Sequence, residues 1–207
     1  MVSKNFFLRF LISTLLFLIY LISLNDIKTL IILILVIYTI IFYEVYKNFK
    51  NLYLFILTYL LISLIFLFLY LYQFFDIFYF NILVFVIITF DSFSYLIGKF
   101  FGKTIVFAKI SPKKTLEGYL GGLFFTNIIF LIYINFFQIT FNLILFILLN
   151  LLIVTAFMGD LIQSFFKRKN FIKDSSNYLP GHGGFFDRFD SFIFAIIFLY
   201  LFKLIIS

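Results

Sequence analysis

The residues from Ser164 to Asp190 form the densest group of chemically capable side chains in this sequence. The chain has only three arginines, one histidine and two prolines, yet two of the arginines, the histidine and one proline lie in this segment. All nine glycines lie between Gly98 and Gly184, so the backbone positions that need glycine are confined to two polar segments. A chain that gathers its few polar residues in this way is expected to do its chemistry there.

Four polar residues lie at positions i, i+4, i+7 and i+8, namely Asp160, Ser164, Lys167 and Arg168. If a helix continues through them past the membrane surface, they share one face. A carboxylate, a hydroxyl and two cations on one face suit a metal ion beside phosphate groups. The alternative is an ordinary basic helix end whose long side chains extend to water. This accounts for Lys169 but not for Asp160, an acid at the membrane edge. We therefore expect a functional role for Asp160.

A glycine-rich loop, Pro-Gly-His-Gly-Gly at residues 180–184, comes before three charged residues. Glycines at this density let the backbone approach a ligand and present N–H groups to anions. Asp187 and Asp190 share a helix face at i and i+3, and beside Arg188 they could bind a divalent cation. For His182, a contact with phosphate, a catalytic role and a structural role all stay open.

A second polar segment follows the fourth apolar run. Asp91 lies inside that run, and an acid in the membrane is costly enough to be a functional candidate by default. The stretch Ser-Pro-Lys-Lys-Thr-Leu-Glu at residues 111–117 offers hydroxyls and ammonium groups to phosphate, and a helix beginning after it would favour anions. Its candidate ligands are Lys113, Thr115 and Glu117. The alternative is a solvated basic loop, which applies most to Lys99, Lys109 and Lys114.

The composition identifies the elements that must position these residues. With 65% hydrophobic and 12% charged residues and a mean hydropathy of +1.19, the chain is expected to be an all-α integral membrane protein. The absence of cysteine excludes disulfides and thiolate metal sites. Apolar runs long enough for a span predict about seven transmembrane helices, the first retained rather than cleaved. These are roughly Phe6–Leu24, Lys28–Tyr43, Leu52–Tyr72, Ile77–Ile97, Tyr119–Phe137, Phe141–Met158 and Ser191–Ile206.

The distribution of basic residues predicts the orientation of these spans. With the N-terminus inside, every lysine and arginine falls on the inner side except Lys28 and Lys203. The polar segments 98–118 and 160–190 are then two cytoplasmic loops that form the site. The net charge of +7 reflects this topology and attraction to anionic lipid, and implies no nucleic-acid partner.

Together these residues resemble a known family signature. The downstream pattern is similar to that of the phosphatidate cytidylyltransferases, or CDP-diacylglycerol synthases: Ser164-x2-Lys167-Arg168-x4-Lys173-Asp174-x7-His182-Gly183-Gly184-x2-Asp187-Arg188-x-Asp190. The segment from Asp91 to Gly122 also resembles the family, which divides the chain into divergent N-terminal helices (1–75) and a catalytic membrane domain (76–207). Ser94 and Ser176 depart from the alanine and glycine usual in the family, and members often have more N-terminal spans.

The resemblance implies a membrane enzyme that condenses CTP with phosphatidate, giving CDP-diacylglycerol and pyrophosphate. It implies dependence on Mg²⁺, with Asp160 and Asp187 as the metal ligands. The predicted catalytic residues are Asp160, Lys167, His182, Asp187, Arg188 and Asp190. The predicted substrate-binding residues are Asp91, Lys113, Thr115, Glu117, Ser164, Arg168, Lys173 and Asp174. We expect the bacterial cytoplasmic membrane, with the site facing the cytoplasm, and leave a homodimer open.

Three other interpretations stay open from the sequence. The first is another CTP-using lipid enzyme, such as a CDP-archaeol synthase or a polyprenol kinase. The second is a transporter. Two observations argue against it: the polar residues collect at one side of the membrane, and no inverted repeat is visible. The third is an inactive homologue. The presence of the full set of signature charges argues against it.

Overall fold

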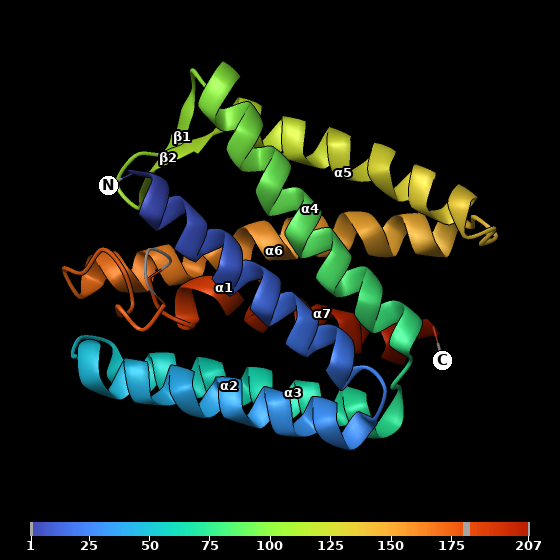
Figure 1. The fold of residues 1–207 in the computed structure, drawn as a ribbon, viewed down its shortest axis with the longest axis horizontal. Helices are drawn as coiled ribbons and strands as arrows, with labels where there is room; N and C mark the ends of the chain where they lie inside the picture. The colour runs from blue at the N-terminus through green and yellow to red at the C-terminus, as the bar shows by residue number, and fades with distance from the viewer. Residues whose placement is uncertain (1, 180–182, 207) are drawn as a thin grey trace. The chain divides into compact units, whose positions relative to one another are not determined.

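A computed structural model describes residues 2–179 and 183–206 of the protein, with side chains from Leu11 onward except that of Ser13. This part of the chain forms seven helices and a two-stranded hairpin, shown in chain order in Figure 1. The elements are α1 (Val2–Ser23), α2 (Ile27–Asn48), α3 (Tyr53–Gln73), α4 (Ile77–Phe101), β1 (Ile105–Phe107), β2 (Ser111–Thr115), α5 (Leu116–Phe136), α6 (Leu143–Lys169) and α7 (Phe186–Ile206). The expected helical fold is confirmed.

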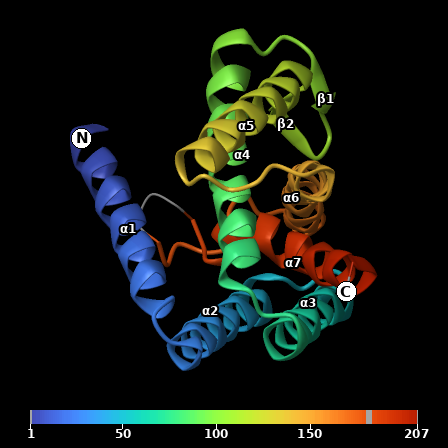
Figure 2. The ribbon, with the colours of Figure 1, turned by 90° about the vertical axis from the view of Figure 1, so that its right-hand side faces the viewer.

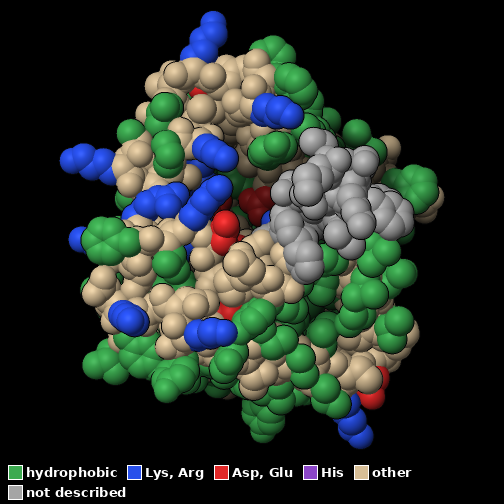
Figure 3. Space-filling model, turned by 60° about the vertical axis from the view of Figure 1, so that its left-hand side comes forward, with side chains coloured by type: hydrophobic (Ala, Val, Ile, Leu, Met, Phe, Trp, Pro, Cys, Tyr) green, Lys and Arg blue, Asp and Glu red, His purple; other side chains and the backbone are tan. Residues whose placement is uncertain are grey.

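Six helices, α2 to α7, are long and apolar enough to cross a membrane. In α1 the apolar stretch within the described side chains is the shorter segment Thr14–Ser23, so the predicted count of seven spans is not confirmed. Hydrophobic side chains cover much of the surface in view in Figure 3, with lysines and arginines standing out from it. Leucines such as Leu54, which is 75% exposed, suit contact with lipid rather than water. The chain is a membrane protein.

Several helices continue beyond the apolar runs that predicted them. Helix α2 ends at Asn48 rather than Tyr43, and α6 ends at Lys169 rather than Met158. Helix α7 begins at Phe186, before the predicted Ser191. The physical reason is that backbone hydrogen bonds do not stop where hydrocarbon stops. The polar residues that ended each predicted span are therefore held on rigid helix.

The chain divides into two compact units. The first contains Met1–Leu64 and Phe166–Phe189, and the second contains Ile65–Phe165 and Asp190–Ser207. The division at residue 75 predicted from the resemblance concerns function rather than compactness, and it stays a prediction.

In the second unit, α4 and α5 pack side by side, as Figures 1 and 2 show. A Cβ at Gly118 would lie 2.8 Å from the backbone oxygen of Ser94 and 3.1 Å from the Cα of Gly98. Backbone atoms cannot move aside as a flexible side chain can, so only glycine allows this approach. Small residues commonly bring membrane helices into close contact in this way.

The strands β1 and β2 correct the prediction that residues 98–118 form a loop. They pair antiparallel, with Ile105 opposite Thr115 and Phe107 opposite Ser111. Glu117 clamps the base of this hairpin, because its carboxylate accepts hydrogen bonds from the backbone N–H groups of Lys103 and Thr104 at 3.0–3.1 Å. The hairpin therefore sets the position of β2 at the start of α5.

Two asparagines pair between α5 and α6 in the second unit. Asn127 donates to Oδ1 of Asn150 at 3.2 Å, and Asn150 donates back to Oδ1 of Asn127 at 3.4 Å. Each amide also donates to a carbonyl four residues earlier in its own helix, at 2.9 Å. Both side chains therefore satisfy their donors and acceptors within two apolar helices.

In the first unit, the turn between α2 and α3 holds the end of α6. Asn51 accepts from Asn170 Nδ2 at 3.0 Å, and its backbone N–H donates to Asn170 Oδ1 at 2.7 Å. Asn51 Nδ2 also donates to the backbone oxygen of Lys169 at 2.9 Å. The ring of Phe49 packs against that of Phe186, 5.8 Å away, at the start of α7. These contacts fix both ends of the polar segment between α6 and α7.

Candidate active site

A lysine and an aspartate form an ion pair at the centre of the predicted motif in the first unit. Lys167 Nζ lies 2.7 Å from Asp187 Oδ1, and the two side chains are only 13% and 9% exposed. The other oxygen of Asp187 accepts from the backbone N–H of Ser175 at 2.7 Å, from its hydroxyl at 3.0 Å, and from the N–H of Gly184 at 3.0 Å. Asp187 lies in the first turn of α7, where the helix end favours a negative charge. Its side chain is therefore held in a fixed orientation.

The two glycines before α7 are required by this arrangement. Gly183 has φ +82°, and a Cβ there would lie 2.6 Å from Asp187 Oδ2. A Cβ on Gly184 would overlap the Ser175 hydroxyl and come within 2.7 Å of both carboxylate oxygens of Glu44. The glycine-rich composition of the loop thus reflects close packing around carboxylates.

Glu44, on α2, belongs to this site and was missed by the sequence analysis. It is fully buried, and its carboxylate accepts from the hydroxyls of Ser175 and Ser176 and from the N–H groups of Phe185 and Phe186. The predicted second span ended one residue before it. The available signal was that Glu44 is one of only two glutamates in the chain and directly follows an apolar run.

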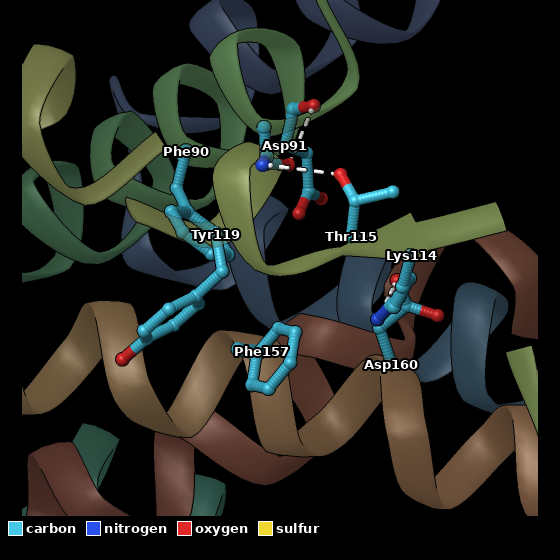
Figure 4. Close-up of a pocket in the computed structure, with 9 residues that line it drawn as sticks. Phe90, Asp91, Lys114, Thr115, Tyr119, Phe157 and Asp160 are labelled. Carbon is cyan, nitrogen blue, oxygen red and sulfur yellow. Dashed lines mark hydrogen bonds and ion pairs between the residues drawn. The ribbon is translucent and has the colours of Figure 1, made fainter. Parts of the chain in front are cut away.

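A pocket in the second unit gathers further predicted residues (Figure 4). Lys114 Nζ lies 2.5 Å from Asp160 Oδ2, with the two side chains 20% and 32% exposed. The same Nζ lies 4.8 Å from the ring centre of Phe157. The pocket is lined by Phe90, Asp91, Ser94, Lys114, Thr115, Gly118, Tyr119, Phe157 and Asp160. It combines a cation, two carboxylates and aromatic rings, which are the groups that recognise a charged aromatic ligand.

The pocket brings together Asp91, Thr115 and Asp160, which the sequence proposed separately. Thr115 caps α5 by accepting from the N–H of Gly118 at 3.2 Å, so its position is fixed by the helix. Lys114, for which a solvated loop position was one open alternative, is paired with Asp160 in the structure. Glu117 is not among the lining residues, since its carboxylate clamps the hairpin.

The other predicted residues differ in their burial and contacts. Ser164 lies one turn after Asp160 on α6 and donates to its Oδ1 at 3.3 Å. Asp190 is 8% exposed and accepts from the N–H of Ser191 at 2.8 Å. His182 lies outside the described residues. The exposed members of the set are Lys113, Arg168, Lys173, Asp174 and Arg188.

The carboxylates fit Mg²⁺ in their chemistry. Mg²⁺ is typically bound by one or two protein carboxylates together with substrate phosphates, rather than by a cage of protein ligands. Among the residues that the structure describes, no group of three or more His, Cys, Asp or Glu side chains could hold a metal ion. Asp160 and Asp187 each lie beside a lysine, as expected where phosphates are also to be bound. Asp160 belongs to the second unit and Asp187 to the first, and their joint binding of magnesium stays a prediction.

Comparison with known proteins gives a consistent assignment. The chain is 48% identical over 109 residues to a phosphatidate cytidylyltransferase of Staphylococcus aureus (strain COL), a match that covers 51% of this chain and 41% of the relative. It is 44% identical over 115 residues to that of Bacillus subtilis (strain 168), covering 53% and 41%. For Aquifex aeolicus (strain VF5) the identity is 44% over 111 residues, covering 54% and 41%.

In each case the matched part of the chain thus spans about two fifths of the relative's length. The sequence model of the cytidylyltransferase family, in contrast, matches residues 2–206, which is nearly the whole chain. The chain belongs to the cytidylyltransferase family.

Proposed function

We propose that this protein transfers CMP from CTP to phosphatidate, giving CDP-diacylglycerol and pyrophosphate. The observation that carries the proposal is the partly buried Lys167–Asp187 pair, which the loop of the family signature holds in place. The curated relatives are named phosphatidate cytidylyltransferases, and their names agree with this reaction. We place the reaction at the cytoplasmic face of a bacterial membrane, because the basic residues predict that orientation.

The reaction needs little help from a base. A phosphate monoester has a second pKa of about 6, so the phosphate of phosphatidate is mainly dianionic at neutral pH. One of its oxygens attacks the α-phosphorus of CTP, and the bond from that phosphorus to the bridging oxygen breaks as pyrophosphate leaves. The barrier lies in bringing one anion to another, so catalysis rests on positioning and charge neutralisation.

The described residues supply that neutralisation. Lys167 is fixed by Asp187 and would present its remaining donors to a phosphate oxygen. The exposed cations of the motif would bind the lipid phosphate and the leaving group, and these are Arg168, Lys173 and Arg188. Asp190 would orient neighbouring groups from its buried position. Bound magnesium, held by Asp160 and Asp187, would add positive charge at the CTP phosphates.

We assign the pocket of the second unit to CTP. Lys114 at its polar end would contact phosphate, while the rings of Phe157 and Tyr119 offer surfaces on which a base can stack. The side chain of Thr115 lies in the same pocket. The acyl chains of phosphatidate would stay in the bilayer, which explains why an enzyme that uses a soluble nucleotide is built from membrane helices.

The direct test is pyrophosphate release by the detergent-purified protein given CTP and phosphatidate, first with Mg²⁺ and then with EDTA. We expect release only when both substrates and the metal are present. Turnover only with a different lipid acceptor, such as a polyprenol or an archaeal ether lipid, would keep the family chemistry and reject phosphatidate. Binding of CTP without turnover on any lipid would indicate an inactive homologue.

Substituting Lys167 tests the phosphate contacts. Lys167→Ala is expected to raise the KM for phosphatidate about 10- to 100-fold, the effect of losing a charge-assisted hydrogen bond. Lys99→Ala is the matched control, because Lys99 also ends a membrane helix but is exposed beside the rings of Tyr95 and Phe100. Steady-state kinetics with each substrate varied in turn measures both variants. Equal KM values for Lys167→Ala and the unchanged protein would remove Lys167 from substrate binding.

A further inference from the structure

Glu44 is a buried carboxylate whose partners all come from the segment between α6 and α7 or from the first turn of α7. Its Oε1 accepts from Ser176 Oγ at 2.7 Å and from the N–H of Phe185 at 2.8 Å. Its Oε2 accepts from Ser175 Oγ and from the N–H of Phe186, both at 3.0 Å. The single hydrogen of the Ser175 hydroxyl is shared with Asp187 Oδ2, so three donors bond only to Glu44 and the fourth is divided between the two carboxylates.

The charge on Glu44 is stabilised by these donors. No lysine or arginine within the described part of the chain forms an ion pair with it. An uncompensated charge in a protein interior is costly, but hydrogen bonds to the charged form offset that cost. Two of the donors, the N–H groups of Phe185 and Phe186, lie at the start of α7, where helix geometry leaves N–H groups without partners. Glu44 therefore caps α7 from another helix.

Ser175 connects this cap to the ion pair. Its hydroxyl lies 3.0 Å from Glu44 Oε2 and 3.0 Å from Asp187 Oδ2, and its backbone N–H donates to the same Asp187 oxygen. Asn48, one turn after Glu44 on α2, donates to the backbone oxygen of Ser175 at 2.6 Å. A continuous chain of contacts thus runs from Glu44 through Ser175 and Asp187 to Lys167.

We propose that Glu44 is a positioning residue, which fixes the start of α7 and, through Ser175, the orientation of Asp187 and Lys167. The reaction that it serves is the proposed cytidylyl transfer, so its catalytic part rests on that function. The hydrogen-bond partners of Glu44 are all protein groups, so it would act through these neighbours. Ser176 adds its hydroxyl to the same carboxylate.

Glu44→Gln separates this role from simple packing. The amide keeps the shape of the side chain but offers one acceptor oxygen instead of two, so either Phe185 or Phe186 loses its acceptor. Asp26→Asn is the matched control. It makes the same change of carboxylate to amide at the other end of α2, where Asp26 caps its own helix and asparagine caps equally well.

Hydrogen exchange of the backbone amides measures positioning without any need for turnover. In Glu44→Gln we expect exchange to become about 10- to 100-fold faster at whichever of Phe185 and Phe186 loses its acceptor, as for loss of a hydrogen bond to a charged group. The proposal also requires faster exchange at Ser175 and Gly184, whose amides donate to Asp187 and not to Glu44. Faster exchange confined to Phe185 or Phe186 would show that Glu44 acts only as a local cap, and would overturn the proposal.

Kinetics provides the second measurement. Glu44→Gln should lower kcat about 10- to 100-fold with little change in the KM for CTP, as for other residues that orient a ligand group. Ser175→Ala interrupts the same chain of contacts. The double variant should therefore be no less active than the less active of the two single variants. Additive losses, or unchanged kcat, would overturn the proposal. If Glu44→Gln does not fold, hydrogen exchange and kinetics are both measured on Ser175→Ala instead.

The two proposals can fail separately. Absence of turnover in the unchanged protein rejects the cytidylyltransferase reaction, while exchange at Ser175 and Gly184 still decides whether Glu44 orders Asp187. Normal turnover with unchanged exchange in Glu44→Gln keeps the reaction and rejects the positioning role.

Discussion

Asp187→Asn is expected to lower kcat about a thousandfold, the scale of losing a charged group that acts directly in phosphoryl transfer. The asparagine keeps the size of the side chain but removes its charge and one acceptor. It cannot both neutralise Lys167 and accept from the amides of Ser175 and Gly184, as the carboxylate does. Pyrophosphate release under saturating CTP and phosphatidate measures the loss.

Folding of this variant has to be checked independently of activity. Asp76→Asn is the control, since Asp76 caps α4 by accepting from the N–H of Phe78 at 2.9 Å and asparagine is an equally good cap. Asp187→Asn should purify as the same detergent-soluble species as this control. Near-normal turnover in Asp187→Asn would exclude Asp187 from the mechanism.

Asp160→Asn, a substitution in the second unit, is expected to lower kcat by a similar factor. The substitution removes the partner of Lys114 and a carboxylate of the type that magnesium prefers. We expect kcat to fall about a thousandfold and half-maximal activity to require more Mg²⁺. Activity measured over a range of Mg²⁺ concentrations tests both expectations.

Two outcomes would contradict this interpretation of Asp160. An unchanged Mg²⁺ dependence with lowered kcat would assign Asp160 to the orientation of Lys114 and remove it from metal binding. Normal kcat would show that the pocket of the second unit is not the CTP site. Asp76→Asn again controls for the change of carboxylate to amide.

The sequence predicted the parts of the fold and site that depend on local pattern. Apolar runs predicted helices, and the spacing of Asp160, Ser164 and Lys167 predicted that they share a helix, which α6 confirms by continuing to Lys169. The density of glycine and charge between residues 180 and 190 indicated the segment that surrounds Asp187. Such signals lie within a few turns of chain and need no tertiary information.

The contacts that were missed join residues far apart in the sequence. Glu44 meets Ser175 across 131 positions and Phe186 across 142, and no local pattern encodes either contact. Lys114 resembled a solvated loop lysine because its partner, Asp160, lies on another helix. The strands β1 and β2 were missed because three and five residues are too few to show an alternating pattern.

The asparagine pair between α5 and α6 has a consequence for how the protein enters the bilayer. Inserted alone, each helix would bring into hydrocarbon an asparagine side chain with an unpaired oxygen and one unpaired N–H group, because only one of its two amide hydrogens is bonded within the same helix. Few residues separate Phe136 from Leu143, so the two segments can meet as soon as the second is synthesised. The unit of insertion is then the helical hairpin rather than the single helix. Glycosylation mapping should find α5 inserted less completely alone than when followed by α6, a difference that Asn127→Leu should remove.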